Sequence, residues 1–223
     1  MDGPERMRGV DATEEPRLAA TVIAARRGAA GVEVLVLQRS AESRFLPGYV
    51  VFPGGAVDAD DHEHALRWFG ATAEAPRACA VRELLEEAGL ALTGKGLREG
   101  GLASVEAEPP RADQLRQISH WVAPEDVPVR FDARFFALRA GVGVEPRPDG
   151  GETARAWWES PVALMEEWAA GRCRLYWPTM KMMEALARCG SVEEVLAAWV
   201  PQEEPVDGDE ERMPRSTFYQ DGE

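Results

Sequence analysis

The chain has 223 residues, of which 45% are hydrophobic and 29% charged, and its formal net charge is -14 at pH 7 with histidine neutral. That composition is ordinary for a globular protein, and the length suffices for one sizeable core with a small appendage. The acidic balance argues against nucleic acid and anionic membrane surfaces as partners. No apolar run approaches the roughly 18 residues of a membrane-spanning helix, and the three cysteines show no paired spacing, so we expect a cytoplasmic protein with reduced thiols.

The first predicted elements are strands. Residues 1–16 are polar and are predicted to be disordered. Two runs rich in Val, Ile and Leu follow, at 18–25 and 32–38, and predict a β-hairpin around a turn of arginines and glycines. A third strand, at 49–52, leads into Pro53-Gly54-Gly55. Two glycines after a strand can let the backbone approach an ion or a phosphate, but such a dipeptide is more often only a turn.

The segment 56–73 is acidic and contains two histidines. A metal site is one interpretation, but acidic loops with stray histidines are more often solvated, and neither cysteines nor a helical histidine pair support a metal here. We therefore predict that Asp58 or Asp60 caps a short helix that ends at Gly70. The packing surface of this helix is predicted to comprise Leu66, Trp68 and Phe69.

A longer helix is predicted between Pro76, which suits a first turn, and Gly89, which suits the left-handed residue just past a helix end. Glu83, Glu86 and Glu87 share one arc of this helix, about 100° wide, and apolar residues occupy the opposite arc. Like charges one turn apart repel by roughly 0.2 to 0.5 kcal/mol per pair, so three together favour a bound cation. Carboxylate oxygens favour Mg²⁺ or Mn²⁺. A solvated acidic face is the alternative interpretation.

More strands are predicted after this helix. Residues 93–116 are rich in Gly and Pro and are expected to be mostly loop. Strands follow at 117–122 and 131–138, and Glu152 leads another strand towards the tryptophans at 157 and 158.

The C-terminal part is predicted to be helical. Residues that favour helix starts, such as serine and proline, and residues that favour helix ends, such as glycine, predict helices at 160–171, 178–190 and 191–201. Trp199 is predicted to lie on the apolar face of the last helix. The acidic residues 202–223 are expected to be flexible. Strands, a prominent helix, more strands and then helices argue for an α+β or layered α/β/α fold.

One segment carries a family resemblance. Arg82-Glu83-Leu84-Leu85-Glu86-Glu87-Ala88-Gly89-Leu90 resembles the second half of the Nudix hydrolase signature, Gly-x5-Glu-x7-Arg-Glu-U-x-Glu-Glu-x-Gly-U with U aliphatic, at every fixed position. Glu74 stands at the signature distance before Arg82. Gly55 corresponds to the leading glycine, but residues 56–73 separate it from Glu74 where the signature has five residues. The chain therefore carries an insertion inside the first half of the signature.

The resemblance implies a fold. It is an α+β fold, a Nudix-type α/β/α sandwich with a mixed, curved sheet. We expect the Nudix domain at 17–160, with its insertion at about 56–73. A C-terminal helical cover at 161–200 and an acidic tail at 201–223 complete the chain.

The resemblance also implies roles for the site residues. Glu86 and Glu87 are expected to coordinate Mg²⁺ or Mn²⁺, together with Glu83 and the Gly55 carbonyl. Arg82 is expected to orient a carboxylate. The catalytic base is Glu83 or, as a weaker candidate, Glu152.

A second motif narrows the expected substrate. Arg39-Ser40-x3-Arg44-x3-Gly48-x-Val50-x-Phe52-Pro53-Gly54-Gly55-x2-Asp58 resembles the motif upstream of the signature in coenzyme A diphosphatases, with Leu37 in place of threonine and Ser43 in place of leucine. The insertion and the segments 130–136 and 177–179 are similar to the branch that contains the mammalian peroxisomal coenzyme A diphosphatase.

The resemblance thus implies a small-molecule diphosphate substrate, coenzyme A or an acyl derivative, with Arg39, Arg44 and Gly54 binding it. One alternative is a Nudix hydrolase of NADH, ADP-ribose, a nucleotide sugar or an oxidised nucleotide. The other is a non-catalytic Nudix-like binding module.

Overall fold

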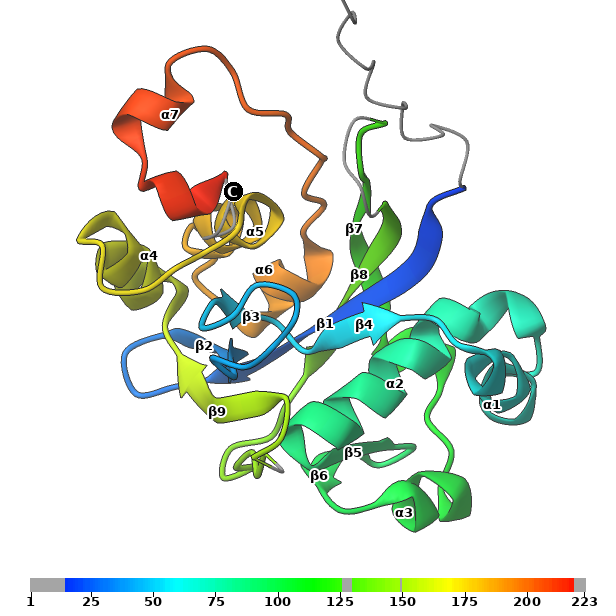
Figure 1. The fold of residues 1–223 in the computed structure, drawn as a ribbon. Coiled ribbons are helices and arrows are strands. Elements are labelled where there is room, and N and C mark those ends of the chain that lie inside the picture. The colour runs from blue at the N-terminus through cyan, green and yellow to red at the C-terminus, as the bar shows by residue number, and fades with distance from the viewer. Residues whose placement is uncertain (1–14, 126–129, 149, 219–223) are drawn as a thin grey trace, which may run out of the picture.

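A mixed β-sheet forms the centre of the molecule (Figure 1). The computed structural model describes residues 15–125, 130–148 and 150–218, so the expected disordered N-terminus lies almost wholly outside it. Within these residues the sheet has seven strands, and β3, β2, β1, β8 and β7 follow one another across it, while β4 pairs with β1 and β9 with β2. The strands are β1 (Arg17–Arg27), β2 (Val32–Arg39), β3 (Val50–Val51), β4 (Gly54–Ala56), β7 (Arg116–Val122), β8 (Phe131–Arg139) and β9 (Thr153–Glu159).

The sheet is mixed because one of its pairings is parallel. β1 and β8 run in the same direction, with Arg17 opposite Phe131 and Ala25 opposite Arg139, whereas the other pairings are antiparallel. The predicted hairpin at 18–38 is confirmed as β1 and β2, and both later strands are confirmed as β7 and β8.

Both faces of the sheet are buried, because successive side chains in a strand point to opposite sides. In β2, Leu35 and Leu37 belong to one core, while Val34 and Val36 belong to the other. The side chains of this continuous apolar run therefore pack alternately into the two cores.

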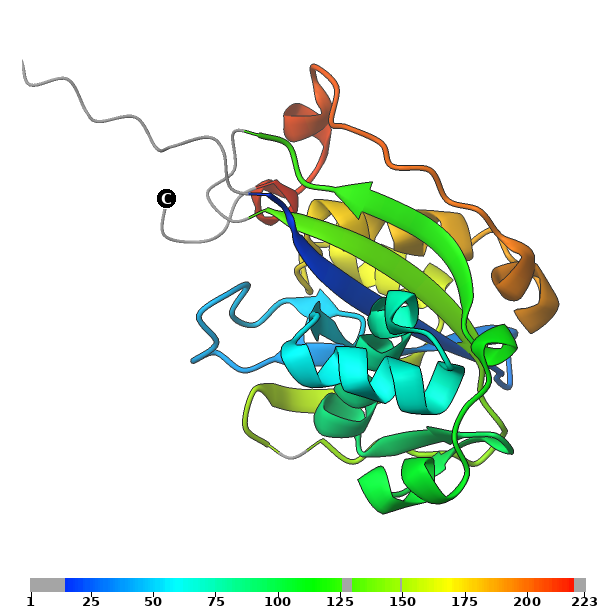
Figure 2. The same ribbon diagram turned by 90° about the vertical axis from the view of Figure 1, so that its right-hand side faces the viewer.

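Helices cover the two faces (Figures 1 and 2). One core lies under α1 (Ala59–Phe69), α2 (Ala75–Ala88) and a small hairpin of β5 (Leu90–Thr93) and β6 (Gly96–Glu99). The opposite core lies under α4 (Pro161–Ala169), α5 (Trp177–Leu186) and α6 (Val192–Ala197). The expected layered arrangement with a C-terminal helical cover is therefore present. None of the helices in the described part of the chain has the length and apolar character needed to span a bilayer.

Two local expectations were wrong. Residues 93–116 are not mostly loop, since they contain β6, α3 (Leu102–Ala107) and a short 3-10 turn, Ala112–Gln114. The prediction failed because glycines at 94, 96, 100 and 101 are typical of loops, whereas here they form the turns and ends of short elements. Gly54 and Gly55 likewise belong to strand β4 rather than to a free turn, and they pair with Thr21 and Ala20 of β1.

Two apolar residues do not pack as predicted. Leu66 of α1 is 56% exposed, and Trp199 is 62% exposed because α6 ends at Ala197, before its ring could join the helix face. Trp68 is buried in the predicted packing surface of α1. The predicted cap at Asp58 is confirmed, and α1 stops at left-handed Gly70 as expected. Ser160, at the start of the helix predicted from residue 160, caps α4.

The C-terminal segment from Gln202 to Phe218, for which we expected a flexible tail, contacts the domain at both of its ends, whereas residues 203–207 are exposed. It forms α7 (Asp209–Arg212) and a 3-10 turn, Arg215–Thr217, near α4 and α5 (Figure 1). Thr217 is fully buried and accepts a hydrogen bond from Trp168 Nε1 at 2.9 Å. The Phe218 ring lies 5.3 Å from that of Trp177. The contacts of Thr217 and Phe218 hold the end of this acidic segment against the helices. The acidic composition of the segment gave no sign of these contacts.

Thr217→Val is expected to lower the melting temperature. Valine keeps the shape of threonine but leaves the buried Trp168 Nε1–H without its acceptor, which costs about 1–3 kcal/mol, and each kcal/mol corresponds to about 2–4 °C in a chain of this size. Thermal unfolding of Thr217→Val and of Ser216→Ala, a control for loss of the neighbouring hydroxyl, measures this effect. Identical melting of both variants and the wild type would show that the segment is not docked in solution.

Candidate active site

Helix α2 positions the acidic residues. It begins after Glu74 with Pro76 in its first turn and ends at Gly89, whose φ of 64° is left-handed, as predicted. Val81, Leu84 and Ala88 are buried in the core below the helix. This packing fixes the rotation of α2, so its acidic arc points away from the sheet core.

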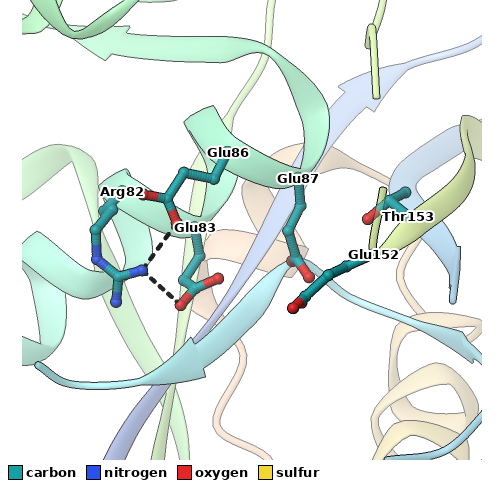
Figure 3. A pocket seen from close by; sticks show the side chains of 6 residues that line it. All are labelled: Arg82, Glu83, Glu86, Glu87, Glu152 and Thr153. Carbon is teal, nitrogen blue, oxygen red and sulfur yellow. Dashed lines mark hydrogen bonds and ion pairs between the residues drawn. The ribbon is translucent and has the colours of Figure 1, made fainter. Parts of the chain in front are cut away.

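The acidic arc forms one wall of a cavity of about 440 Å³ (Figure 3). Glu152 and Thr153, from the start of β9, belong to the same cavity, although they are far from α2 in the sequence. The lining residues are Arg82, Glu83, Glu86, Glu87, Glu152 and Thr153. The structure thus brings together five of the predicted site residues.

Arg82 is bonded to two glutamates of its own helix. Its Nη1 donates to Glu83 Oε1 at 2.8 Å and to Glu86 Oε2 at 3.0 Å. These contacts limit the directions in which the two carboxylates can point. Burial raises the pKa of the Glu83 carboxyl, and the guanidinium of Arg82 opposes that rise.

The strongest partner of Arg82 is a residue that sequence reasoning assigned to no site. Asp61 in α1 accepts from Arg82 Nε at 3.0 Å and from Nη2 at 2.9 Å, and its side chain is completely buried. The 56–73 segment is therefore not simply a solvated acidic loop. Two sequence signals could have pointed to Asp61. Five residues, 56–60, separate it from Gly55, which is the spacing between the leading glycine and the first glutamate of the signature. It also stands three residues after the helix cap Asp58 and completes a capping box there.

Glu87 sits deeper in the cavity wall than its neighbours, with 8% of its surface exposed. Its Oε2 accepts from the Gly54 backbone N–H at 2.9 Å, and its Oε1 lies 3.8 Å from Arg39 Nη1. Burial raises the pKa of Glu87 to about 8, the Glu83 and Glu152 carboxylates add to the rise, and the Gly54 amide and Arg39 oppose it. The Glu87 carboxylate is thus poorly compensated by the protein alone.

Strand β4 lies close to α2 at Gly55 and close to β1 at Gly54. A Cβ on Gly55 would collide with the Glu83 carboxylate, and a Cβ on Gly54 would lie 2.5 Å from the Ala20 carbonyl oxygen. The Gly55 carbonyl, a predicted metal ligand, accepts a weak hydrogen bond from Cys79 Sγ at 3.5 Å. The two glycines therefore allow the backbone to reach the acidic face.

The donor set of the cavity suits a hard divalent cation. Glu83, Glu86, Glu87 and the Gly55 carbonyl offer only oxygen atoms, which Mg²⁺ and Mn²⁺ prefer. Two of these carboxyls have raised pKa values because of burial, and a cation would offset that cost of ionisation. Across residues 15–125, 130–148 and 150–218, no three Asp, Glu, His or Cys side chains already converge into a coordination site. Arg82 instead engages an oxygen of Glu83 and of Glu86, so these side chains must shift to take a shared ion.

Some predicted residues lie apart from the cavity. Arg44 is exposed on the loop between β2 and β3 and does not line it. Glu74, at the signature position, forms an ion pair with Arg77. Within the insertion, His64 stacks on Trp68 with ring centroids 4.4 Å apart, which is a packing role.

Glu87→Gln is expected to stabilise the protein at pH 8 when no divalent cation is added. Because the folded-state pKa of about 8 lies above the ordinary 4.5, wild-type stability falls as the pH rises between these values and the buried carboxyl ionises. Glutamine keeps an acceptor for the Gly54 amide without the charge. The melting temperature of Glu87→Gln should exceed that of the wild type at pH 8 and approach it near pH 5. Glu166→Gln, an exposed control on α4, should show no such divergence. A pH-independent difference for Glu87→Gln would contradict the assignment.

Comparison with known proteins agrees with this geometry. The NUDIX domain family matches residues 15–176. The crystal structure of a NUDIX hydrolase from Alicyclobacillus acidocaldarius superposes with a TM-score of 0.71 and 30% identity, covering 83% of this chain and 98% of that one. The fold of this chain is therefore the expected Nudix-type α+β sandwich.

Two further relatives are more distant. The putative nudix hydrolase 7 of Caenorhabditis elegans is 28% identical over 174 residues, which is 70% of this chain and 56% of that protein. This chain thus spans little more than half the length of that relative. The NUDIX domain of Shewanella oneidensis NrtR, solved in complex with ADP ribose, shares the fold with a TM-score of 0.52 and 13% identity, over 81% of this chain and 92% of that one. With the signature helix in the cavity wall and a family match over most of its length, the chain belongs to the Nudix family.

Proposed function

We propose that this protein is a hydrolase that cleaves a diphosphate linkage with the help of Mg²⁺ or Mn²⁺. The observation that carries the proposal is the single cavity that gathers Arg82, the three glutamates of α2 and Glu152. Nudix hydrolases generally use divalent metal cations. A non-catalytic binding module is less well supported, because nothing about such a role calls for all three glutamates around one cavity.

The chemistry of a diphosphate explains why such a cavity is needed. The negatively charged bridge repels a nucleophile, and catalysis therefore depends on positioning and on neutralising charge. A divalent cation held by Glu83, Glu86, Glu87 and the Gly55 carbonyl would neutralise the diphosphate oxygens and lower the pKa of the attacking water. The glutamates themselves would repel the substrate without it.

The protein's own groups supply orientation and a proton acceptor. Arg82 holds Glu83 and Glu86 through one nitrogen, which limits the directions in which these carboxylates can point. Glu83 and Glu152 are the candidate bases. Glu83 forms an ion pair with Arg82. Glu152 lies outside α2, at the start of β9, and faces Glu87 across the cavity (Figure 3).

The proposed substrate is coenzyme A or an acyl derivative. Support comes from the Arg39 to Asp58 motif and from the need of an acidic protein to meet phosphates with local arginines. Arg39 is well placed, since its guanidinium reaches Glu87 and its side chain is only 17% exposed. Because the Shewanella Nudix domain was solved with ADP ribose, ADP-ribose belongs among the alternative substrates, with NADH, nucleotide sugars and oxidised nucleotides.

A hydrolysis panel with product masses tests the reaction. With Mg²⁺ or Mn²⁺, coenzyme A should give a phosphopantetheine product and adenosine 3′,5′-bisphosphate. Glu86→Gln and Glu87→Gln should abolish turnover and retain the wild-type circular dichroism spectrum, because neither side chain supports the core. Near-normal turnover in both variants would refute the cation site. Brisk cleavage of NADH or ADP-ribose without cleavage of any coenzyme A species would refute only the substrate.

Arg44→Ala tests recognition of the 3′-phosphate without disturbing the cavity, because Arg44 lies outside the cavity lining. Loss of a charge-assisted contact costs about 1.5–3 kcal/mol, so kcat/KM for coenzyme A should fall roughly ten- to a hundredfold, and less for dephospho-coenzyme A. Arg67→Ala, an exposed arginine on α1, is the matched control. Equal losses on both substrates would assign Arg44 to the diphosphate, and no loss on either would remove it from the site.

A further inference from the structure

A second cavity, of about 410 Å³, lies where β7 begins and β8 ends, and it shares no lining residue with the acidic cavity. Leu92 and Leu138, which belong to the core under α2, line it from one side. Leu196 of α6, which packs on the opposite core, also lines it. The cavity therefore lies at the edge of the sheet between the two helical layers, and its volume suits a small molecule.

The charged residues of this cavity are mostly positive, although the chain as a whole carries a formal net charge of -14. Arg111, Arg116 and Arg139 line it together with one acid, Asp113. Like charges that lie close together repel one another, so a group of arginines in an acidic protein favours a bound anion.

The register of two strands brings two of these arginines together. Arg116 pairs with Ala137 across β7 and β8, and Arg139 stands two residues further along β8. Residues two apart in a strand point to the same face, and such diagonal neighbours on adjacent strands lie roughly 7–8 Å apart. Arg116 and Arg139 are therefore placed on one face of the sheet, close enough for a single anion to contact both.

Arg116 is the arginine whose charge is left over. Arg111 pairs with Asp113 at 3.1 Å and Arg139 pairs with Glu193 at 2.7 Å. Arg116 is exposed and forms no ion pair within residues 15–125, 130–148 and 150–218. Its guanidinium is thus available to a ligand in the cavity.

The two paired arginines also keep N–H donors for a ligand. Arg111 uses Nε for Asp113 and Nη1 for the Gly94 carbonyl, which accepts at 2.8 Å. Arg139 uses Nη2 for its glutamate. Because a guanidinium has five N–H groups, donors remain on both side chains. The bond to the Gly94 carbonyl also holds Arg111 beside the cavity.

We infer that this cavity is a second binding site, which takes a phosphate group of a small molecule without the help of a metal ion. Guanidinium groups match the oxygen geometry of a phosphate. Three arginines and one aspartate leave a difference of two positive charges in the lining, which matches the charge of about -1.5 to -2 on a phosphate monoester at pH 7. A carboxylate would offset only one of them. This site goes beyond the proposed hydrolase reaction and does not depend on it.

Titration calorimetry with phenyl phosphate tests the site without turnover, in excess EDTA so that no divalent cation occupies the acidic cavity. Loss of a charge-assisted contact costs roughly tenfold or more in affinity, so Arg116→Gln should weaken binding by at least that factor. Arg67→Gln removes the same charge outside the cavity and should stay within about twofold of the wild type. A wild type that binds no phenyl phosphate, or equal losses in both variants, would overturn the inference.

Benzoate separates phosphate recognition from binding of the aromatic ring. It has the same ring but a single carboxylate charge, and it should bind roughly tenfold more weakly than phenyl phosphate, because it offers fewer oxygens and less charge to the arginines. Equal affinity for the two compounds would contradict the assignment to phosphate.

Asp113→Asn tests the same site by a gain of affinity, which damage to the fold could not produce. It removes the one acid of the lining and releases Arg111, so phenyl phosphate should bind about two- to fivefold more tightly. Glu106→Gln, which neutralises an acid outside the cavity, is the matched control and should leave the affinity unchanged. An unchanged or weaker affinity in Asp113→Asn would count against the site. Because these variants leave the acidic cavity intact, either result is independent of the proposed diphosphate cleavage.

Discussion

The arrangement of side chains in the cavity wall depends on the ion pairs of the Arg82 guanidinium, because four carboxylates surround this group. Asp61 and Glu83 lie 2.9 and 2.8 Å away, Glu86 at 3.0 Å and Asp58 at 3.6 Å. These residues come from two helices and a helix cap, so a single positive charge joins the insertion to the signature helix. Five N–H donors in a fixed plane make this possible, and a lysine at the same position could not hold two sets of partners in defined directions.

The other end of the acidic arc depends on the backbone. Glu87 accepts a hydrogen bond from the Gly54 amide, and β4 has little space on either side, since a Cβ on Gly55 would meet the Glu83 carboxylate and a Cβ on Gly54 would meet the backbone of β1. β4 in turn is paired with β1 in the middle of the sheet. The geometry around Glu87 is thus tied to the most buried part of the molecule, which explains how a poorly compensated carboxyl stays in place.

Local signals in the sequence predicted local features well. The spacing of Glu83, Glu86 and Glu87, the left-handed residue at Gly89 and the cap at Asp58 depend on neighbours within one or two helical turns. The docking of Thr217 depends on a partner far away in the chain, Trp168, and no local pattern predicts that contact. The contact of Asp61 with Arg82 also joins distant residues, although the spacing of Asp61 from Gly55 is that of the signature glycine and its first glutamate. Glu152 stands between these cases, since a family resemblance suggested it but only the pairing of β9 with β2 brings it to α2.

The parallel pairing of β1 with β8 has a consequence for how the molecule is built. Strands that join residues 17–25 to residues 131–139 must close a long stretch of chain before any of their hydrogen bonds stabilise it. Both helices that carry Arg82 and Asp61 lie inside that stretch. α1 and α2 are close in sequence, so their contact closes a far shorter loop than the pairing of β1 with β8. The wall that contains Glu152 depends on the pairing of β9 with β2, which closes a similarly long stretch of chain, so the complete cavity exists only when both long-range pairings are formed.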